Sequence, residues 1–169
     1  MIHHVTMPAR SPEHVANVLA EIMGATARPF LGPIEGAFNV MLEDEHGTAI
    51  EVLPDQTVMV PGEGDAPCSF ARGDCPTLSP FHFLFSVKCD RETIERIGAR
   101  EGWRTRHFWR GPPGKSVQLI EFWVENRFQI EFMTPEMVPD YVAFERVAAQ
   151  DAKRAAMAAH WAAQGRKIV

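Results

Sequence analysis

Two short apolar segments of this chain each carry one glutamate at their centre: Glu51 in residues 49–53 and Glu131 in residues 129–133. Successive side chains of a β-strand point to opposite faces, so each carboxylate faces away from the apolar residues beside it. For one such strand alone, a half-exposed sheet with a solvated glutamate is the favoured interpretation. Because the same pattern recurs after eighty residues, it indicates a repeated unit in which the glutamate has a functional role.

A histidine accompanies each glutamate, His4 in the alternating stretch 2–9 and His82 in the alternating stretch 81–87. The two histidines are 78 positions apart, so one small insertion reconciles their spacing with that of the glutamates. Strand alternation aligns His4, rather than His3, with His82. If the two halves join their concave faces, two imidazoles and two carboxylates converge. That ligand set suits a divalent ion such as Zn, Ni, Co, Mn or Fe.

The elements that must position these residues follow the same order twice. Each half is predicted to begin with a strand, followed by a helix, a loop and two further strands, with one more strand starting near Trp103. A Ser-Pro pair and an Asp supply the helix start signals, and a glycine follows each helix. We divide the chain into a first module (1–54), a linker rich in Pro and Gly (55–79), a second module (80–135) and a C-terminal helical extension (136–169).

The composition excludes several classes of function. The chain has 169 residues, 46% of them hydrophobic, and a formal net charge of −5. It has no run of Lys and Arg that would suit nucleic acid, and no apolar run approaches the length of a membrane span. The N-terminal residues lack the pattern of a signal peptide, so we expect a cytoplasmic protein whose three cysteines stay reduced.

The C-terminal extension shows helical spacing of apolar residues and an alanine-rich run at 152–163. A helix this apolar needs a partner surface, either on the cup formed by the two halves or on a second subunit. We therefore predict a homodimer that uses this helix and binds a small-molecule substrate, without nucleic-acid or membrane partners.

The sequence resembles the vicinal oxygen chelate superfamily, which includes glyoxalase I, methylmalonyl-CoA epimerase, extradiol dioxygenases and fosfomycin-resistance proteins. The resemblance covers roughly residues 1–135 and is carried by four motifs: Ile-His-His-Val-Thr-Met (2–7), Ala-Ile-Glu-Val (49–52), Phe-His-Phe-Leu-Phe (81–85) and Ile-Glu-Phe (130–132). It implies an α+β fold in which two βαββ modules form a cupped mixed sheet. It also implies one divalent metal ion per site, with Zn or Ni preferred over Fe, Mn or Co, bound by His4, Glu51, His82 and Glu131.

The four-ligand set implies a branch of the superfamily. Extradiol dioxygenases of this kind typically use two His and one Glu, whereas a second carboxylate favours the glyoxalase and epimerase branches. The implied activity is a lyase or isomerase/epimerase that acts on a small substrate with vicinal oxygens through an enediolate-like intermediate. Glu131 is preferred as the base by analogy with the family. An iron-dependent extradiol-type dioxygenase and a non-catalytic small-molecule binding or resistance protein remain alternatives.

Further polar residues are candidates for the interior of the cup. Strand alternation points Glu121 and Trp123 inward, and the eighty-residue offset places Met41 at the position equivalent to Glu121. Glu121 is either a second catalytic acid or the partner of a nearby arginine in the cavity wall. Asn39, Trp123 and Arg110 are the candidate substrate-binding residues. Whether the site lies within one chain or between two copies stays open.

Overall fold

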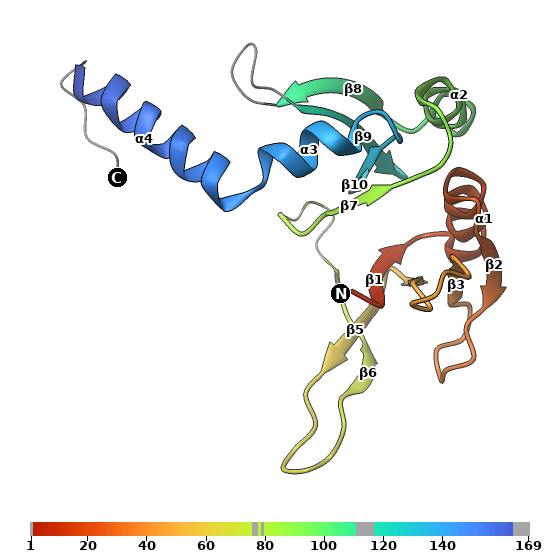
Figure 1. Cartoon of the computed structure of the whole chain (residues 1–169). Coiled ribbons are helices and arrows are strands. Elements are labelled where there is room, and N and C mark those ends of the chain that lie inside the picture. The colour runs from red at the N-terminus through yellow and green to blue at the C-terminus, as the bar shows by residue number, and fades with distance from the viewer. Residues whose placement is uncertain (1, 76–77, 79, 111–116, 164–169) are drawn as a thin grey trace.

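The computed structural model describes residues 2–75, 78, 80–110 and 117–163 of the chain. Each half contributes one four-stranded mixed sheet and one helix that follows the first strand of that half. Figure 1 shows the two halves together with a hairpin and a C-terminal helical arm that extend from the body. The α+β prediction is confirmed, although the halves form two separate sheets rather than one continuous cupped sheet.

The first half consists of a strand, a helix and three more strands. Its elements are β1 (His4–Ala9), α1 (Pro12–Met23), β2 (Thr26–Pro29), β3 (Phe38–Met41) and β4 (Ala49–Pro54). The strand order across the sheet is β1-β4-β3-β2, with β1 parallel to β4 and the other pairs antiparallel. Helix α1 has Pro12 at its first position and ends at Gly24, whose φ of 62° suits a residue without a Cβ. The apolar face of α1 packs on β2, β3 and β4.

The second half repeats this order. Its elements are β7 (Phe83–Ser86), α2 (Arg91–Glu101), β8 (Thr105–Arg110), β9 (Val117–Val124) and β10 (Phe128–Met133). The strand order is β7-β10-β9-β8, again with only the first pair parallel. Asp90 caps α2, because its carboxylate accepts a hydrogen bond of 2.9 Å from the backbone N–H of Thr93.

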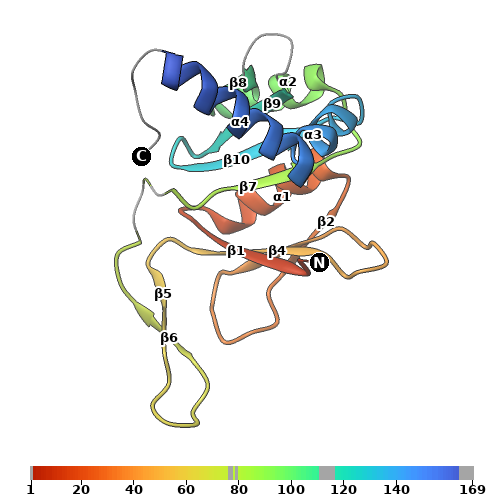
Figure 2. The same ribbon diagram turned by 60° about the vertical axis from the view of Figure 1, so that its left-hand side comes forward.

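The helices of the two halves meet in one core. Helix α1 contacts α2, and apolar residues from both helices and both sheets form a single buried cluster. Ion pairs join the halves around it, with Arg100 Nη2 at 2.8 Å from Glu21 Oε2 and Arg127 Nη1 at 2.6 Å from Asp55 Oδ2. Figure 2 shows β1 beside β4 in the first half and β7 beside β10 in the second half. The face of each sheet that is free of α1 and α2, called the helix-free face below, therefore turns away from this shared core, and in the second half the later helix α3 (Val138–Phe144) packs over part of it.

Three strands occur where the sequence predicted only loop or linker. Strand β2 falls at the start of the stretch rich in Gly and Pro, so the first half has three strands after its helix rather than two; in the second half, β8 is the strand predicted to start near Trp103. The predicted linker (55–79) contains a hairpin of β5 (Thr57–Val60) and β6 (Ser69–Arg72), which projects from the body in Figure 1. All four residues of β6 are exposed, so the alternation that indicates a half-buried strand is missing there.

The C-terminal extension is helical, as predicted. It contains α3 (Val138–Phe144), which packs against β9, and α4 (Val147–Ala163), which extends away from the body in Figure 1. None of the described side chains of α4 is buried, so its partner surface stays a prediction. The last six residues of the extension (164–169) lie outside the described residues. No helix among the described residues is long and apolar enough to cross a membrane.

Candidate functional site

In the first half, strand pairing fixes the face on which the predicted metal ligands lie. Thr6 of β1 pairs with Glu51 of β4, and His4 precedes Thr6 by two residues. His4, Thr6 and Glu51 therefore share the helix-free face of the first sheet. Glu51 Oε2 accepts a hydrogen bond of 2.8 Å from Thr6 Oγ1.

The second half shows the same arrangement around a more deeply buried carboxylate. Leu84 pairs with Glu131 across β7 and β10. His82 precedes Leu84 by two residues, just as His4 precedes Thr6 by two residues in the first half. Glu131 is 1% exposed. Its Oε1 accepts a hydrogen bond of 3.2 Å from Arg110 Nη2, and its Oε2 lies 3.7 Å from His82 Nε2. A buried carboxylate without a partner is costly, so Arg110 acts here as its counter-ion.

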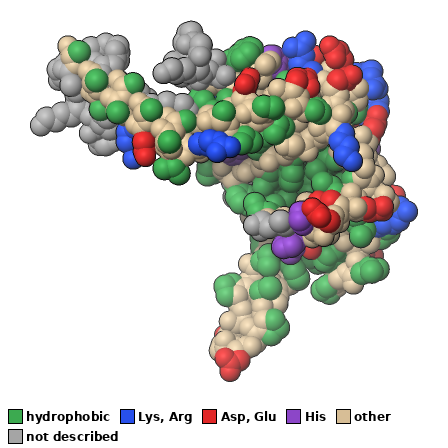
Figure 3. All heavy atoms as spheres, viewed as in Figure 1, with side chains coloured by type: hydrophobic (Ala, Val, Ile, Leu, Met, Phe, Trp, Pro, Cys, Tyr) green, Lys and Arg blue, Asp and Glu red, His purple; other side chains and the backbone are tan. Residues whose placement is uncertain are grey.

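The two histidines line one cavity between the edge strands β1 and β7. This cavity of about 350 Å³ has largely apolar walls that include Phe83 and Phe85. Figure 3 shows hydrophobic side chains gathered in the hollow between the two halves. Glu51 and Glu131 are not among the residues that line the cavity. The register confirms the alignment of His4 with His82, while the two glutamates lie apart from the space that the histidines share.

One chain brings the four predicted ligands together as two pairs. Among the described residues, no group of three or more His, Cys, Asp or Glu side chains is placed to bind a metal ion. A structural or catalytic zinc site needs three or four protein ligands. The residues that the structure describes in a single chain therefore do not by themselves fit a complete metal centre. Each half instead offers one imidazole and one carboxylate on its helix-free face.

Glu121 lies beside Glu131 on the same face. The two residues are direct partners across β9 and β10, and Arg106 of β8 is the partner of Glu121 on its other side. No ion pair between Arg106 and Glu121 occurs in the described part of the chain. Like charges opposite each other on neighbouring strands repel, so this pair favours a cation nearby, and Arg110 supplies one beside Glu131.

Asn39, not Met41, occupies the position equivalent to Glu121. Asn39 pairs with Glu51 in the same way that Glu121 pairs with Glu131. The equivalence predicted from the eighty-residue offset is therefore wrong. The chain from Asn39 to Glu51 is two residues longer than the chain from Glu121 to Glu131, and the turn between β3 and β4 takes up this difference.

Helix α3 brings a tyrosine to the second sheet. It packs against β9, and Tyr141 lies close enough to Glu131 and Arg110 to be affected by their charges. Burial raises the pKa of Tyr141, the carboxylates of Glu145 and Glu131 raise it further, and Arg110 opposes them. Tyr141 therefore stays a neutral hydrogen-bonding group well into the alkaline range.

Trp123 shares the face of Glu121, two residues along β9. Its indole Nε1 is buried and has no hydrogen-bond partner in the described part of the chain. Together with Arg104 and Asn126 it lines a shallow cavity of about 180 Å³. Trp123 is therefore separated from the cavity of the two histidines, and its assignment to substrate stays a prediction.

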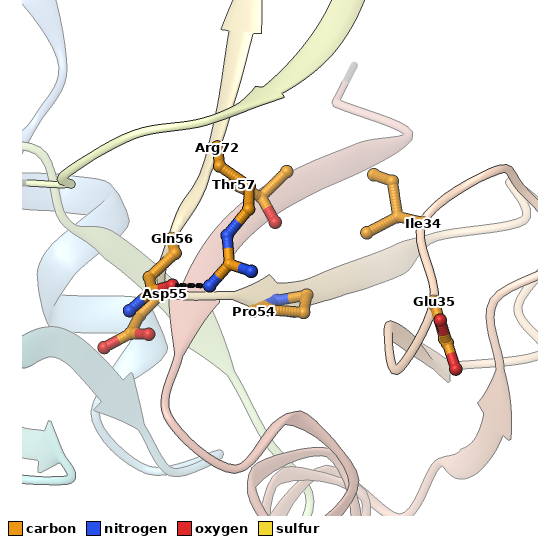
Figure 4. Close-up of a pocket in the computed structure, with 7 residues that line it drawn as sticks. All are labelled: Ile34, Glu35, Pro54, Asp55, Gln56, Thr57 and Arg72. Atoms are coloured by element: carbon orange, nitrogen blue, oxygen red, sulfur yellow. Dashed lines mark hydrogen bonds between the residues drawn. The ribbon is translucent and has the colours of Figure 1, made fainter.

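A further cavity lies at the base of the β5–β6 hairpin. It has a volume of about 410 Å³, and Figure 4 shows its lining with the hydrogen bond between Arg72 and Gln56. None of the candidate site residues belongs to this lining, which consists of Ile34, Glu35, Pro54, Asp55, Gln56, Thr57 and Arg72.

Three residues near the candidate site were not found from the sequence. Strand alternation places Thr6 on the same face as His4, so Thr6 could have been predicted from the sequence. Arg28 pairs with Asn39 from β2, a strand that the sequence did not predict. Nothing in the sequence indicates which sheet α3 packs against, so the position of Tyr141 near Glu131 could not be predicted.

No family model and no curated protein matches the sequence. Among solved structures, the fosfomycin resistance protein FosX from Listeria monocytogenes is 12% identical with a TM-score of 0.51, covering 78% of this chain and 87% of that chain. A FosX variant in complex with Mn(II) and 1S,2S-dihydroxypropylphosphonic acid is 11% identical with a TM-score of 0.51, covering 79% and 91%. A glyoxalase family protein from Enterococcus faecalis is 20% identical with a TM-score of 0.45, covering 78% and 95%. The chain has the fold of the vicinal oxygen chelate superfamily.

Proposed function

We propose that this chain is a divalent-metal-dependent enzyme, a lyase or isomerase/epimerase that acts on a small substrate with vicinal oxygens. The observation that carries the proposal is the matched placement of one histidine and one glutamate on the helix-free face of each sheet. A likeness in fold to a protein that binds Mn(II) and a dihydroxy compound supports this choice of chemistry.

The proposed metal centre forms between two copies of the chain. His4 and Glu51 of one copy meet His82 and Glu131 of the other, which gives two equivalent sites in a homodimer. The pairing of ligands within one chain and the outward direction of the helix-free faces support this arrangement. Strands β1 and β7 are also edge strands of their sheets, and edge strands readily pair with another chain.

In this proposal the chain's own carboxylates move the proton. A bound divalent ion would hold two substrate oxygens and acidify the neighbouring C–H group. Glu131, once substrate displaces it as a ligand, would accept that proton, and Glu121, directly opposite, would pass it on. Arg110 forms an ion pair with Glu131 in the absence of substrate. When this ion pair breaks, Arg110 is free to bind an anionic group of the substrate.

A non-catalytic binding protein is the second candidate. The Arg110–Glu131 ion pair favours it, because this pair occupies a carboxylate that a metal centre would need. The metal content of the purified protein distinguishes the two functions.

The test is elemental analysis of wild-type protein and of His82→Ala and Glu131→Ala variants. We expect close to one Zn or Ni ion per chain in the wild type and a large loss of metal in both variants. His46→Ala removes an exposed histidine elsewhere and should keep its metal. Bound Fe with oxygen uptake would favour a dioxygenase. Metal-free wild-type protein, or full metal content in both site variants, would refute the proposed function.

A further inference from the structure

The helix-free face of the first sheet ends in a cavity of about 600 Å³ beside β2 and β3. This volume is in the range of small-molecule binding sites. The residues used below are Arg28, Phe30, Leu31, Gly32, Asn39 and Met41, all of which line it. It is separate from the cavity that His4 and His82 share, and it lies at the other edge of the same sheet.

Arg28 supplies an available positive charge. Its Nη1 donates a hydrogen bond of 2.8 Å to the carbonyl oxygen of Ala27. No carboxylate forms an ion pair with Arg28 in the described part of the chain. A guanidinium has five N–H donors, so most of them remain available to an anionic group in the cavity.

Asn39 adds a polar group next to this charge. Arg28 and Asn39 are direct partners across β2 and β3, so their side chains are neighbours on one face. The Oδ1 atom of Asn39 is buried without a hydrogen-bond partner in the described structure, which is costly. Rotation about the terminal torsion presents either the oxygen or the NH₂ group to the cavity. A ligand oxygen beside the anionic group satisfies this amide.

The remaining wall is apolar. The ring of Phe30 packs so closely over Gly32 that a Cβ there would overlap it. Leu31 is fully exposed and Met41 is 42% exposed, so both offer apolar surface to a bound molecule. An aromatic or branched apolar group of a ligand fits against these side chains.

This cavity is aligned with the proposed metal ligands of the first half. Arg28 pairs with Asn39, and Asn39 pairs with Glu51. Two strand spacings, roughly 10 Å, separate Arg28 from Glu51. A small molecule anchored at Arg28 therefore extends along the row of paired residues towards Glu51.

We propose that this cavity binds a small carboxylate with an apolar body and a hydroxyl or carbonyl oxygen next to the carboxylate. The carboxylate contacts Arg28, the neighbouring oxygen contacts Asn39, and the apolar body packs on Phe30 and Met41. The site lies two strands away from Glu51 and shares no residue with the proposed metal centre, so the inference goes beyond the proposed function.

The test uses mandelate as the probe, titrated into EDTA-treated full-length protein by isothermal calorimetry. Mandelate should bind more tightly than phenylacetate, which lacks the hydroxyl, than 1-phenyl-1,2-ethanediol, which lacks the charge, and than lactate, which lacks the ring. Arg28→Met should weaken mandelate binding about tenfold or more, because it removes a charge-assisted hydrogen bond. Asn39→Leu should make mandelate and phenylacetate bind alike.

Arg72→Met is the matched control, because it removes an exposed arginine from a different cavity. It should leave mandelate binding unchanged, and circular dichroism checks that each variant is folded. Absence of saturable mandelate binding to the wild type, or equal affinity in wild type and Arg28→Met, would overturn the inference. Since the protein carries no metal in this experiment, such a result contradicts only the carboxylate site. A metal-free protein as purified contradicts the proposed function instead.

Discussion

At the scale of single residues, Glu131 has the most constrained environment of the candidate ligands. It is almost fully buried, and its two oxygens face Arg110 and His82. Glu121 lies opposite it on the next strand, and Tyr141 approaches from α3. Glu51, in contrast, is only half-buried and accepts a hydrogen bond from a neutral threonine. The two carboxylates that repeat in the sequence are therefore not equivalent in the folded chain.

The tyrosine beside Glu131 reports on this environment. The chain has a single tyrosine, so absorbance at 295 nm follows the ionisation of Tyr141 directly. Its pKa should lie above the ordinary value of 10.0, because burial and nearby carboxylates disfavour the tyrosinate. Glu131→Gln removes one of these negative charges and leaves Arg110 unpaired, so the pKa of Tyr141 should fall.

Glu92→Gln is the control, because it neutralises a carboxylate in the first turn of α2. It should leave the titration of Tyr141 unchanged. An unchanged or higher pKa in Glu131→Gln would show that Glu131 and Tyr141 are not neighbours in solution.

At the scale of elements, the close contact between α2 and β8 depends on one glycine. A Cβ at Gly98 would overlap Oγ1 of Thr105 and approach the ring of Phe122 to 3.4 Å. Gly98→Ala raises intrinsic helix propensity by up to about 1 kcal/mol. Overpacking costs about 1–3 kcal/mol. We therefore expect a net decrease in the free energy of unfolding, measured by urea denaturation.

Thr105→Ala removes the hydroxyl that the new Cβ would meet, so adding it to Gly98→Ala should recover part of the lost stability. If Gly98→Ala alone is more stable than the wild type, helix propensity outweighs packing and α2 has room to move from β8.

The elements that carry the candidate ligands could be predicted because period-two alternation fixes faces independently of tertiary structure. This is why the alignment of His4 with His82 is confirmed by the strand register. The offset that matched Met41 with Glu121 failed, because loop length differs between the halves and only pairing reveals it. Strand β2 was missed because Pro and Gly dominate the stretch that begins with it.

At the scale of the whole molecule, the direction of the two sheets could not be predicted from the sequence. The repeat indicates two similar halves, but it does not say whether their helix-free faces meet within one chain. In the structure the helices share one core, and although His4 and His82 line one cavity, no three of the described ligand candidates come together. A second copy of the chain is thus the proposed source of the missing ligands.

Complementation between two defective variants tests this arrangement. His4→Ala and His82→Ala each damage both sites of their own homodimer. In a heterodimer of the two, one site carries both substitutions and the other carries neither. Co-expression with different affinity tags isolates this heterodimer, which should bind about half of the wild-type metal because one of its two symmetric sites is intact.

The matched control is a heterodimer of His4→Ala with Glu51→Ala. These substitutions belong to the same half of the site, so each of its two sites has lost one ligand and metal content should not recover. If the His4→Ala/His82→Ala heterodimer binds no more metal than its parents, the ligands do not combine across subunits. A single-chain mass for the wild type in solution would have the same consequence, because a monomer offers each metal ion only one pair of ligands.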